Sequence, residues 1–167
     1  MTKMTLAKAR TRAAWPLAIH ESAHVIVARR LGVSVSQATI QTDHDSCAHI
    51  LHGAASVYQN ILIGLAGPAA ERRLGRRGSE CDPALADEDA EYWALVPEFA
   101  AENGVTLNDD PDDPAERQWQ LRDIYNALVA EVQQLLTTEW GAVEHFALAL
   151  MVHRTLTARM VALCDAA

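Results

Sequence analysis

The stretch that decides the fold runs from Pro16 to Gly32 and reads PLAIHESAHVIVARRLG. Its composition predicts a helix over 16–31. Pro16 suits the first turn, two arginines suit the last turn, where cations complement the helix dipole, and Gly32 suits the left-handed position just past the end. Nearly every side of this helix is apolar, which predicts a buried element.

A pentapeptide inside this helix, HESAH, contains the candidate metal-binding and catalytic residues. Residues four apart share a helix face, so His20 and His24 present two imidazoles to one point, and Glu21 can reach a water molecule there. This is the H-E-x-x-H pattern of zinc peptidases, in which the histidines bind Zn²⁺ and the glutamate is the general base. The alternative is two half-buried histidines on an amphipathic helix. A buried Glu between two His is costly without compensation, so we predict a metal site.

Composition limits the class of protein. The chain has 167 residues and a formal net charge of −8, which predicts one acidic globular domain and no nucleic-acid partner. Its three cysteines follow no C-x-x-C spacing, which favours a reducing compartment. Without an apolar leader or a long apolar run, we expect a cytoplasmic protein without a membrane span.

The remaining pattern predicts a mainly α fold, a helical bundle with a small β-hairpin or sheet next to the H-E-x-x-H helix. Residues 1–13 form an N-terminal lead-in, and 14–167 form the domain. A hairpin is expected from strands over 33–41 and 47–52. The other expected elements are a helix over 54–75 broken near Gly67 and Pro68, a helix over 83–101, an acidic loop over 103–114, helices over 115–137 and 139–152, and a short helix after Thr157.

A catalytic zinc site needs a third protein ligand and one open position. From the residues alone Asp82 is an N-cap, because it directly precedes Pro83. The candidates for the third ligand are Glu71, Cys81, Asp82, Asp87, Asp89, His44, His49 and His52.

Four segments together resemble the peptidase domain of FtsH-type zinc proteases. These are HESAH, ILIGLAGPAAE ending at Glu71, GSECD ending at Asp82, and the C-terminal stretch from Val132 to Leu163, in the family's order. The family shows H-E-A-G-H, L-G-G-R-A-A-E and G-A-x-N-D-L-x-x-A. The resemblance implies that His20, His24 and Asp82 bind Zn²⁺. It also implies that Glu21 is the general base and that Glu71 orients a metal ligand or its helix, with Glu71 as a direct ligand the alternative.

The chain also departs from the family. It has no phosphate-binding G-x-x-x-x-G-K-[ST] loop, and no membrane span precedes the peptidase motif, so the resemblance implies a free-standing peptidase domain. Cys81 stands where the family has Asn, and it is an alternative soft ligand. We therefore expect a separate ATPase or unfoldase to be a partner, or ATP dependence to be absent. A homo-oligomer is a further expectation.

The predicted function is that of a zinc metalloendopeptidase that hydrolyses unfolded or regulatory proteins. The alternative is a non-catalytic helical binding or regulatory module that keeps zinc as a structural device. We also expect one strand of the hairpin to border the metal, so that its edge between Gln37 and Gln41 holds an extended peptide by strand addition. The alternative is a hairpin that only covers the core.

Overall fold

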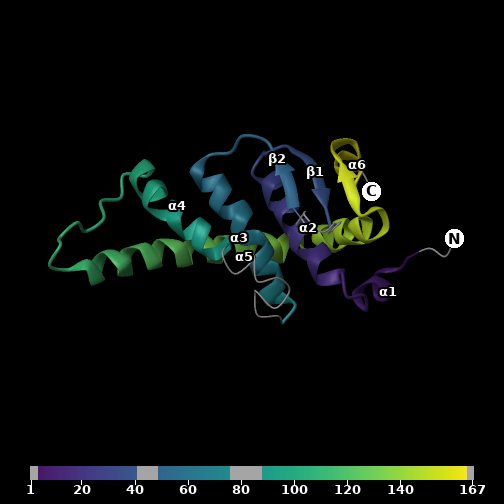
Figure 1. Cartoon of the computed structure of the whole chain (residues 1–167), viewed down its shortest axis with the longest axis horizontal. Helices are drawn as coiled ribbons and strands as arrows, with labels where there is room; N and C mark the ends of the chain where they lie inside the picture. Colours follow the sequence, from purple (N-terminus) through teal and green to yellow (C-terminus); the bar gives the residue numbers. More distant parts are fainter. Residues whose placement is uncertain (1–3, 41–48, 76–87, 165–167) are drawn as a thin grey trace, which may run out of the picture.

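The computed structural model describes residues 4–40, 49–75 and 88–164. These residues are mainly helical and include a small antiparallel sheet, as the sequence predicts (Figure 1). The elements follow one another as α1 (Leu6–Arg10), α2 (Trp15–Arg30), β1 (Val35–Thr39), β2 (His49–His52), α3 (Val57–Arg73), α4 (Glu88–Glu102), α5 (Pro114–His153), β3 (Thr155–Thr157) and α6 (Ala158–Leu163).

Helix α2 is the central element and carries the pentapeptide. It begins with Pro16 in its first turn and ends before Gly32, whose φ of +76° is the left-handed conformation that glycine adopts at no steric cost. Every residue from Ala18 to Ala28 is buried. The predicted helix over 16–31 is confirmed to within one residue at each end, and its burial is confirmed.

Helices α2, α3 and α5 pack against one another and form the core together with the sheet. Helix α3 runs without a break through Pro68, so the predicted break near Gly67 and Pro68 is wrong. Proline removes one N–H from the helix ladder, and its ring crowds the preceding turn. Contacts with α2, α4 and α5 on several sides of α3 outweigh that local penalty.

Helix α5 spans 40 residues and underlies most of the molecule (Figure 1). The prediction of two helices, over 115–137 and 139–152, is therefore wrong. The expected boundary contained Thr137 and Thr138, which have low helix propensity. Their hydroxyls donate to the carbonyls of Gln133 (2.8 Å) and Gln134 (3.2 Å) within the helix. Burial of Leu136 and Val143 on either side of them outweighs the low local propensity.

The sheet has the strand order β2-β1-β3, and both pairs are antiparallel. The hairpin of β1 and β2 confirms the strand prediction, although residues 41–48 between them lie outside the described part. Strand β3 was not predicted. It pairs with residues 37–39 of β1, so β1 is the central strand, and the predicted substrate-binding edge between Gln37 and Gln41 is wrong where the structure describes it. Within the described part of the chain, the outer strands are β2 and β3.

Helix α4 and the first half of α5 run side by side at one end of the molecule, joined by the predicted acidic loop (Figure 1). The ring of Trp93 packs edge-on against Tyr125 with ring centroids 5.1 Å apart. Helix α4 continues through Pro97 to Glu102, one residue past the predicted end, and the predicted start at Pro83 lies outside the described residues.

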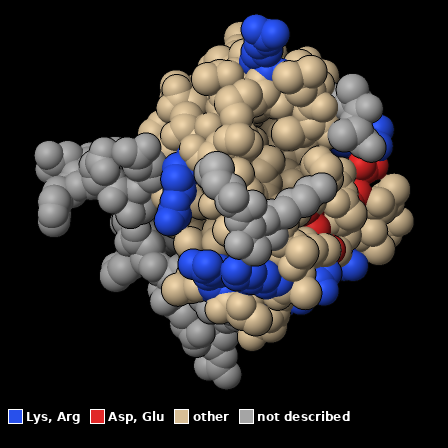
Figure 2. Space-filling model, turned by 90° about the vertical axis from the view of Figure 1, so that its right-hand side faces the viewer, with Lys and Arg blue, Asp and Glu red and all other residues tan. Residues whose placement is uncertain are grey.

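Charge is divided along the long axis of the molecule. Residues 88–116, which make up α4, the acidic loop and the start of α5, contain Asp and Glu but neither Lys nor Arg. Figure 2 faces the opposite end, near the sheet and α6, and there Lys and Arg are the more prominent charged groups. None of the described helices is long and apolar enough to cross a bilayer.

Candidate metal centre

His20 and His24 lie one turn apart on α2 and face α3. Their ring centroids are 4.7 Å apart and the ring planes meet at 73°. Both side chains are buried, with His20 1% and His24 7% exposed. The helix thus brings two imidazoles to one place inside the protein, as the four-residue spacing predicts.

The two Nε2 atoms converge on Gly67 of α3. A Cβ added at Gly67 would lie 2.5 Å from Nε2 of His20 and 2.5 Å from Nε2 of His24. Because both Nε2 atoms lie 2.5 Å from this one Cβ position, they are at most twice that distance apart. A separation within this limit is compatible with a single ion whose Zn–N bonds are about 2.0–2.1 Å long. Any residue larger than glycine would place carbon where both nitrogens point.

The other nitrogen of each ring, Nδ1, lies within hydrogen-bond distance of an oxygen atom of α3. Nδ1 of His20 lies 3.0 Å from Oε1 of Glu71, and Nδ1 of His24 lies 2.6 Å from the carbonyl oxygen of Ile63. A neutral imidazole that donates through Nδ1 keeps its lone pair on Nε2, the atom beside Gly67. Metal-binding histidines are usually oriented by such carboxylate or carbonyl partners, which favour the tautomer that a metal ligand needs.

Glu71 lies in the position expected of an orienting carboxylate. It is 1% exposed and reaches His20 across the interface between α2 and α3. Glu71 therefore contacts His20, one of the two predicted metal ligands, and its role as an orienting group stays a prediction.

Glu21 is the third buried polar group of the pentapeptide. It is only 2% exposed, and its Oε2 atom is shielded from solvent. Burying a carboxylate in an apolar helix costs free energy unless cations or donors offset the charge. A metal ion beside His20 and His24 would offset it, so Glu21 also fits a metal centre.

The predicted third ligand, Asp82, lies outside the described residues and stays a prediction. The same holds for His44, Cys81 and Asp87, and the description of Asp89 does not extend to its side chain. Among the described residues, no group of three or more His, Cys, Asp or Glu side chains is arranged to hold a metal ion. His49 and His52 lie on β2, where Nδ1 of His52 is 2.8 Å from the carbonyl of Gly53.

Sequence reasoning missed the role of two glycines in α3. Gly64 and Gly67 lie three residues apart and therefore on one face of the helix. Gly67 admits the two imidazoles, and Gly64 admits the ring of Tyr92 from α4. The pattern G-x-x-G inside a buried helix was the available signal, because glycine there marks a close approach by another group.

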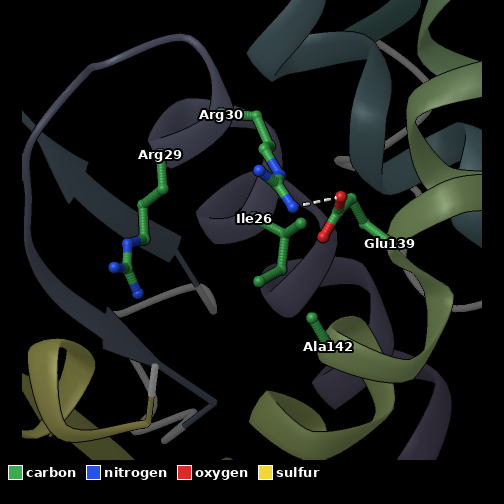
Figure 3. Close-up of a pocket in the computed structure, with 5 residues that line it drawn as sticks. All are labelled: Ile26, Arg29, Arg30, Glu139 and Ala142. Carbon is green, nitrogen blue, oxygen red and sulfur yellow. Dashed lines mark ion pairs between the residues drawn. The ribbon is translucent and has the colours of Figure 1, made fainter. Parts of the chain in front are cut away.

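A hollow of about 260 Å³ lies between α2 and α5 at the end of α2 (Figure 3). Arg30 forms an ion pair across it with Glu139, while Ile26 and Ala142 form part of its apolar lining. Arg29 points away from that pair, and its guanidinium lies 5.8 Å from the centre of the Phe146 ring. These contacts join the end of α2, the helix that carries both histidines, to α5.

No model of a protein family matches the chain, and no similar sequence is found among curated proteins.

Proposed function

We propose that this chain is a zinc-dependent metallopeptidase. The observation that carries the proposal is the convergence of two Nε2 atoms beside Gly67, with both Nδ1 atoms directed at acceptors. Glu21, buried one residue after the first histidine, supplies the carboxylate that peptide hydrolysis needs. The resemblance of four segments to FtsH-type peptidases supports the same reading.

His20 and His24 would hold the ion through Nε2, and Asp82 is the proposed third ligand. A bound Zn²⁺ supplies Lewis-acid chemistry, which activates water and polarises a carbonyl at neutral pH. Glu21 takes the proton from the attacking water and delivers it to the amine as the peptide bond breaks. Glu71 keeps the His20 ring in the tautomer that leaves Nε2 available to a metal.

The proposed substrates are extended, unfolded or regulatory polypeptides, and a separate ATPase or unfoldase is the proposed source of unfolded chains. Both follow from the resemblance. A role as a zinc-stabilised binding module is the competing function, and Glu21 argues against it, because a structural zinc site requires no buried general base.

The experiment that tests the proposal combines metal analysis with casein hydrolysis. We expect about one Zn²⁺ per chain, loss of hydrolysis on chelation, and lower thermal stability of the metal-free protein. Glu21→Gln should keep zinc and lose turnover, because a neutral amide cannot accept the water's proton. Glu102→Gln, an exposed change on α4, is the matched control.

The possible outcomes distinguish the peptidase from the zinc-stabilised binding module. Zinc with Glu21-dependent hydrolysis supports the peptidase. Zinc without hydrolysis of any test protein supports the binding module. A protein that folds without zinc and takes up none contradicts both.

A further inference from the structure

A second hollow, of about 320 Å³, lies between the last turns of α3 and the middle of α5, which contact one another. Its lining combines two arginines with buried apolar residues, and none of the lining residues is acidic. The lining residues are Ala69, Arg72, Arg73, Gln133, Leu136 and Thr137. We call this site the arginine hollow. It shares no lining residue with the hollow at the end of α2.

The guanidinium of Arg73 is held from two sides by α5. Its Nη1 atom donates to Oγ1 of Thr137 at 3.0 Å, and that hydroxyl donates in turn to the carbonyl of Gln133 at 2.8 Å. The guanidinium carbon lies over the ring of Trp140, 4.6 Å from its centre, in a cation–π contact. These contacts use one face of the guanidinium and one of its several N–H donors. The group is therefore oriented while most of its donors remain for another acceptor.

The carboxylates nearest in sequence to this lining have other partners. Glu71 faces the first histidine of α2, and Glu131 accepts a hydrogen bond from a tyrosine of α3. Glu139 forms its ion pair with Arg30. Within residues 4–40, 49–75 and 88–164, no carboxylate forms an ion pair with Arg73. The positive charge at the arginine hollow is therefore not neutralised by this part of the chain.

We propose that the arginine hollow binds a small anion through a carboxylate or phosphate group, two oxygens of which accept hydrogen bonds from Arg73. A planar guanidinium matches a pair of oxygens at that spacing, and an orientation fixed in advance lowers the entropy cost of binding. The side-chain amide of Gln133 supplies a further donor, and Arg72 adds positive charge to the lining. A volume at the small end of ligand pockets suits a small molecule. This binding depends on neither zinc nor peptide hydrolysis.

The alternative role of Arg73 is purely structural. Its contacts with Thr137 and Trp140 join α3 to α5, and that role needs no bound anion. The two roles differ in what titration with an anion shows. A binding site saturates with one anion per chain, whereas a solvated surface arginine gives only a weak effect that follows ionic strength.

The first test titrates the full chain with inorganic phosphate and, separately, with succinate, while sodium chloride keeps the ionic strength constant. Nuclear magnetic resonance follows the amide signals. We expect saturable binding of at least one of the two anions with a Kd of about 1 mM or lower, and signal shifts at Arg73, Gln133 and Thr137. The anion that binds more tightly identifies phosphate or carboxylate as the preferred group. Absence of saturable binding, or shifts confined to other residues, overturns the proposal.

The second test compares variants for affinity and thermal midpoint. Arg73→Gln should bind the preferred anion at least about tenfold more weakly, because charge-assisted hydrogen bonds are lost. Arg122→Gln removes the same charge from an exposed position of α5 outside the hollow and should bind as wild type does. Equal losses in the two variants indicate a general charge effect and overturn the proposal, as does wild-type affinity in Arg73→Gln.

Two milder variants keep the test decisive if Arg73→Gln fails to fold. Arg73→Lys keeps the positive charge but loses the planar pair of donors, and Thr137→Val keeps Arg73 but removes the hydroxyl that orients it. Both should fold and bind the anion severalfold more weakly than wild type. Wild-type affinity in both variants overturns the proposal.

Discussion

At the scale of single residues, Gly67 decides whether His20 and His24 can share one ligand. Both Nε2 atoms lie 2.5 Å from the position that a Cβ would occupy, closer than Cβ contacts found in real proteins. The proposed metal site therefore depends on a residue that contributes no donor atom.

Gly67→Ala tests this dependence without touching a ligand. The new methyl group must push both imidazoles away, so we expect zinc affinity to fall by about a hundredfold or more. Titration with zinc and a competing chelator measures the change, and circular dichroism checks that the helices persist. Gly141→Ala should bind zinc as wild type does. Wild-type zinc affinity in Gly67→Ala would place the metal elsewhere.

A second zinc titration distinguishes the roles of Glu71 and Asp82. Glu71→Ala removes the acceptor 3.0 Å from Nδ1 of His20 and should weaken zinc about 10–100-fold, the usual effect of losing an orienting partner. Glu71→Gln, which keeps an acceptor oxygen, should lose less. Asp82→Ala should weaken zinc more than Glu71→Ala does. If Asp82→Ala costs only about 1 kcal/mol of stability and leaves zinc in place, Asp82 is a helix cap.

At the scale of elements, a hydrogen bond joins α3 to α5 beside the core. The hydroxyl of Tyr58 donates to Oε1 of Glu131, and the Tyr58 ring stacks on Phe99 with centroids 5.8 Å apart. Burial raises the pKa of Tyr58 to about 12, and the hydrogen bond and the negative charge of Glu131 add to the increase. The folded protein thus holds this proton more tightly than the unfolded chain, where tyrosine titrates near pH 10.

This shift predicts a pH dependence of stability. The contribution of Tyr58 is fully present below about pH 10 and is lost as the pH rises toward about 12, because the unfolded chain gives up the proton first. Wild type should therefore lose more stability than Tyr58→Phe between pH 10 and 12, as measured by urea unfolding. Near pH 7 the two should differ by about 1 kcal/mol or less, since the pair is near the surface. Parallel curves for the two proteins would contradict the shift.

At the scale of the whole molecule, the C-terminal segment closes the fold. Strand β3 pairs with β1, and Thr155 Oγ1 lies 2.9 Å from Thr39 Oγ1, so residues more than a hundred positions apart share one ladder. Leu156 of this strand is fully buried, whereas Leu163 at the end of α6 is 60% exposed.

Two leucine truncations measure how much this closure contributes. Leu156→Ala should lower the free energy of unfolding by about 2–5 kcal/mol through lost burial and the cavity left behind. Leu163→Ala, the same change in the same segment, should stay within about 0.5 kcal/mol. Thermal or urea unfolding gives both values. Equal effects would mean that β3 does not pack on the core as described.

The sequence by itself determined what depends on neighbouring residues. The bounds of α2, the left-handed Gly32, the hairpin and the mainly α class follow from spacing and turn chemistry within short windows. The pairing of His20 with His24 follows for the same reason, because one helical turn fixes it.

Tertiary structure alone decided the features that join distant residues. Packing from several sides keeps α3 helical through Pro68. Strand β3 pairs with the edge of β1 that the sequence alone predicted to bind substrate. The acceptors that fix both histidine tautomers and the glycines that admit the imidazoles and Tyr92 come from α3, about 40 to 50 residues along the chain. A short segment of sequence does not determine which face of α3 packs against α2, because the packing of these helices depends on the free energy of the whole core.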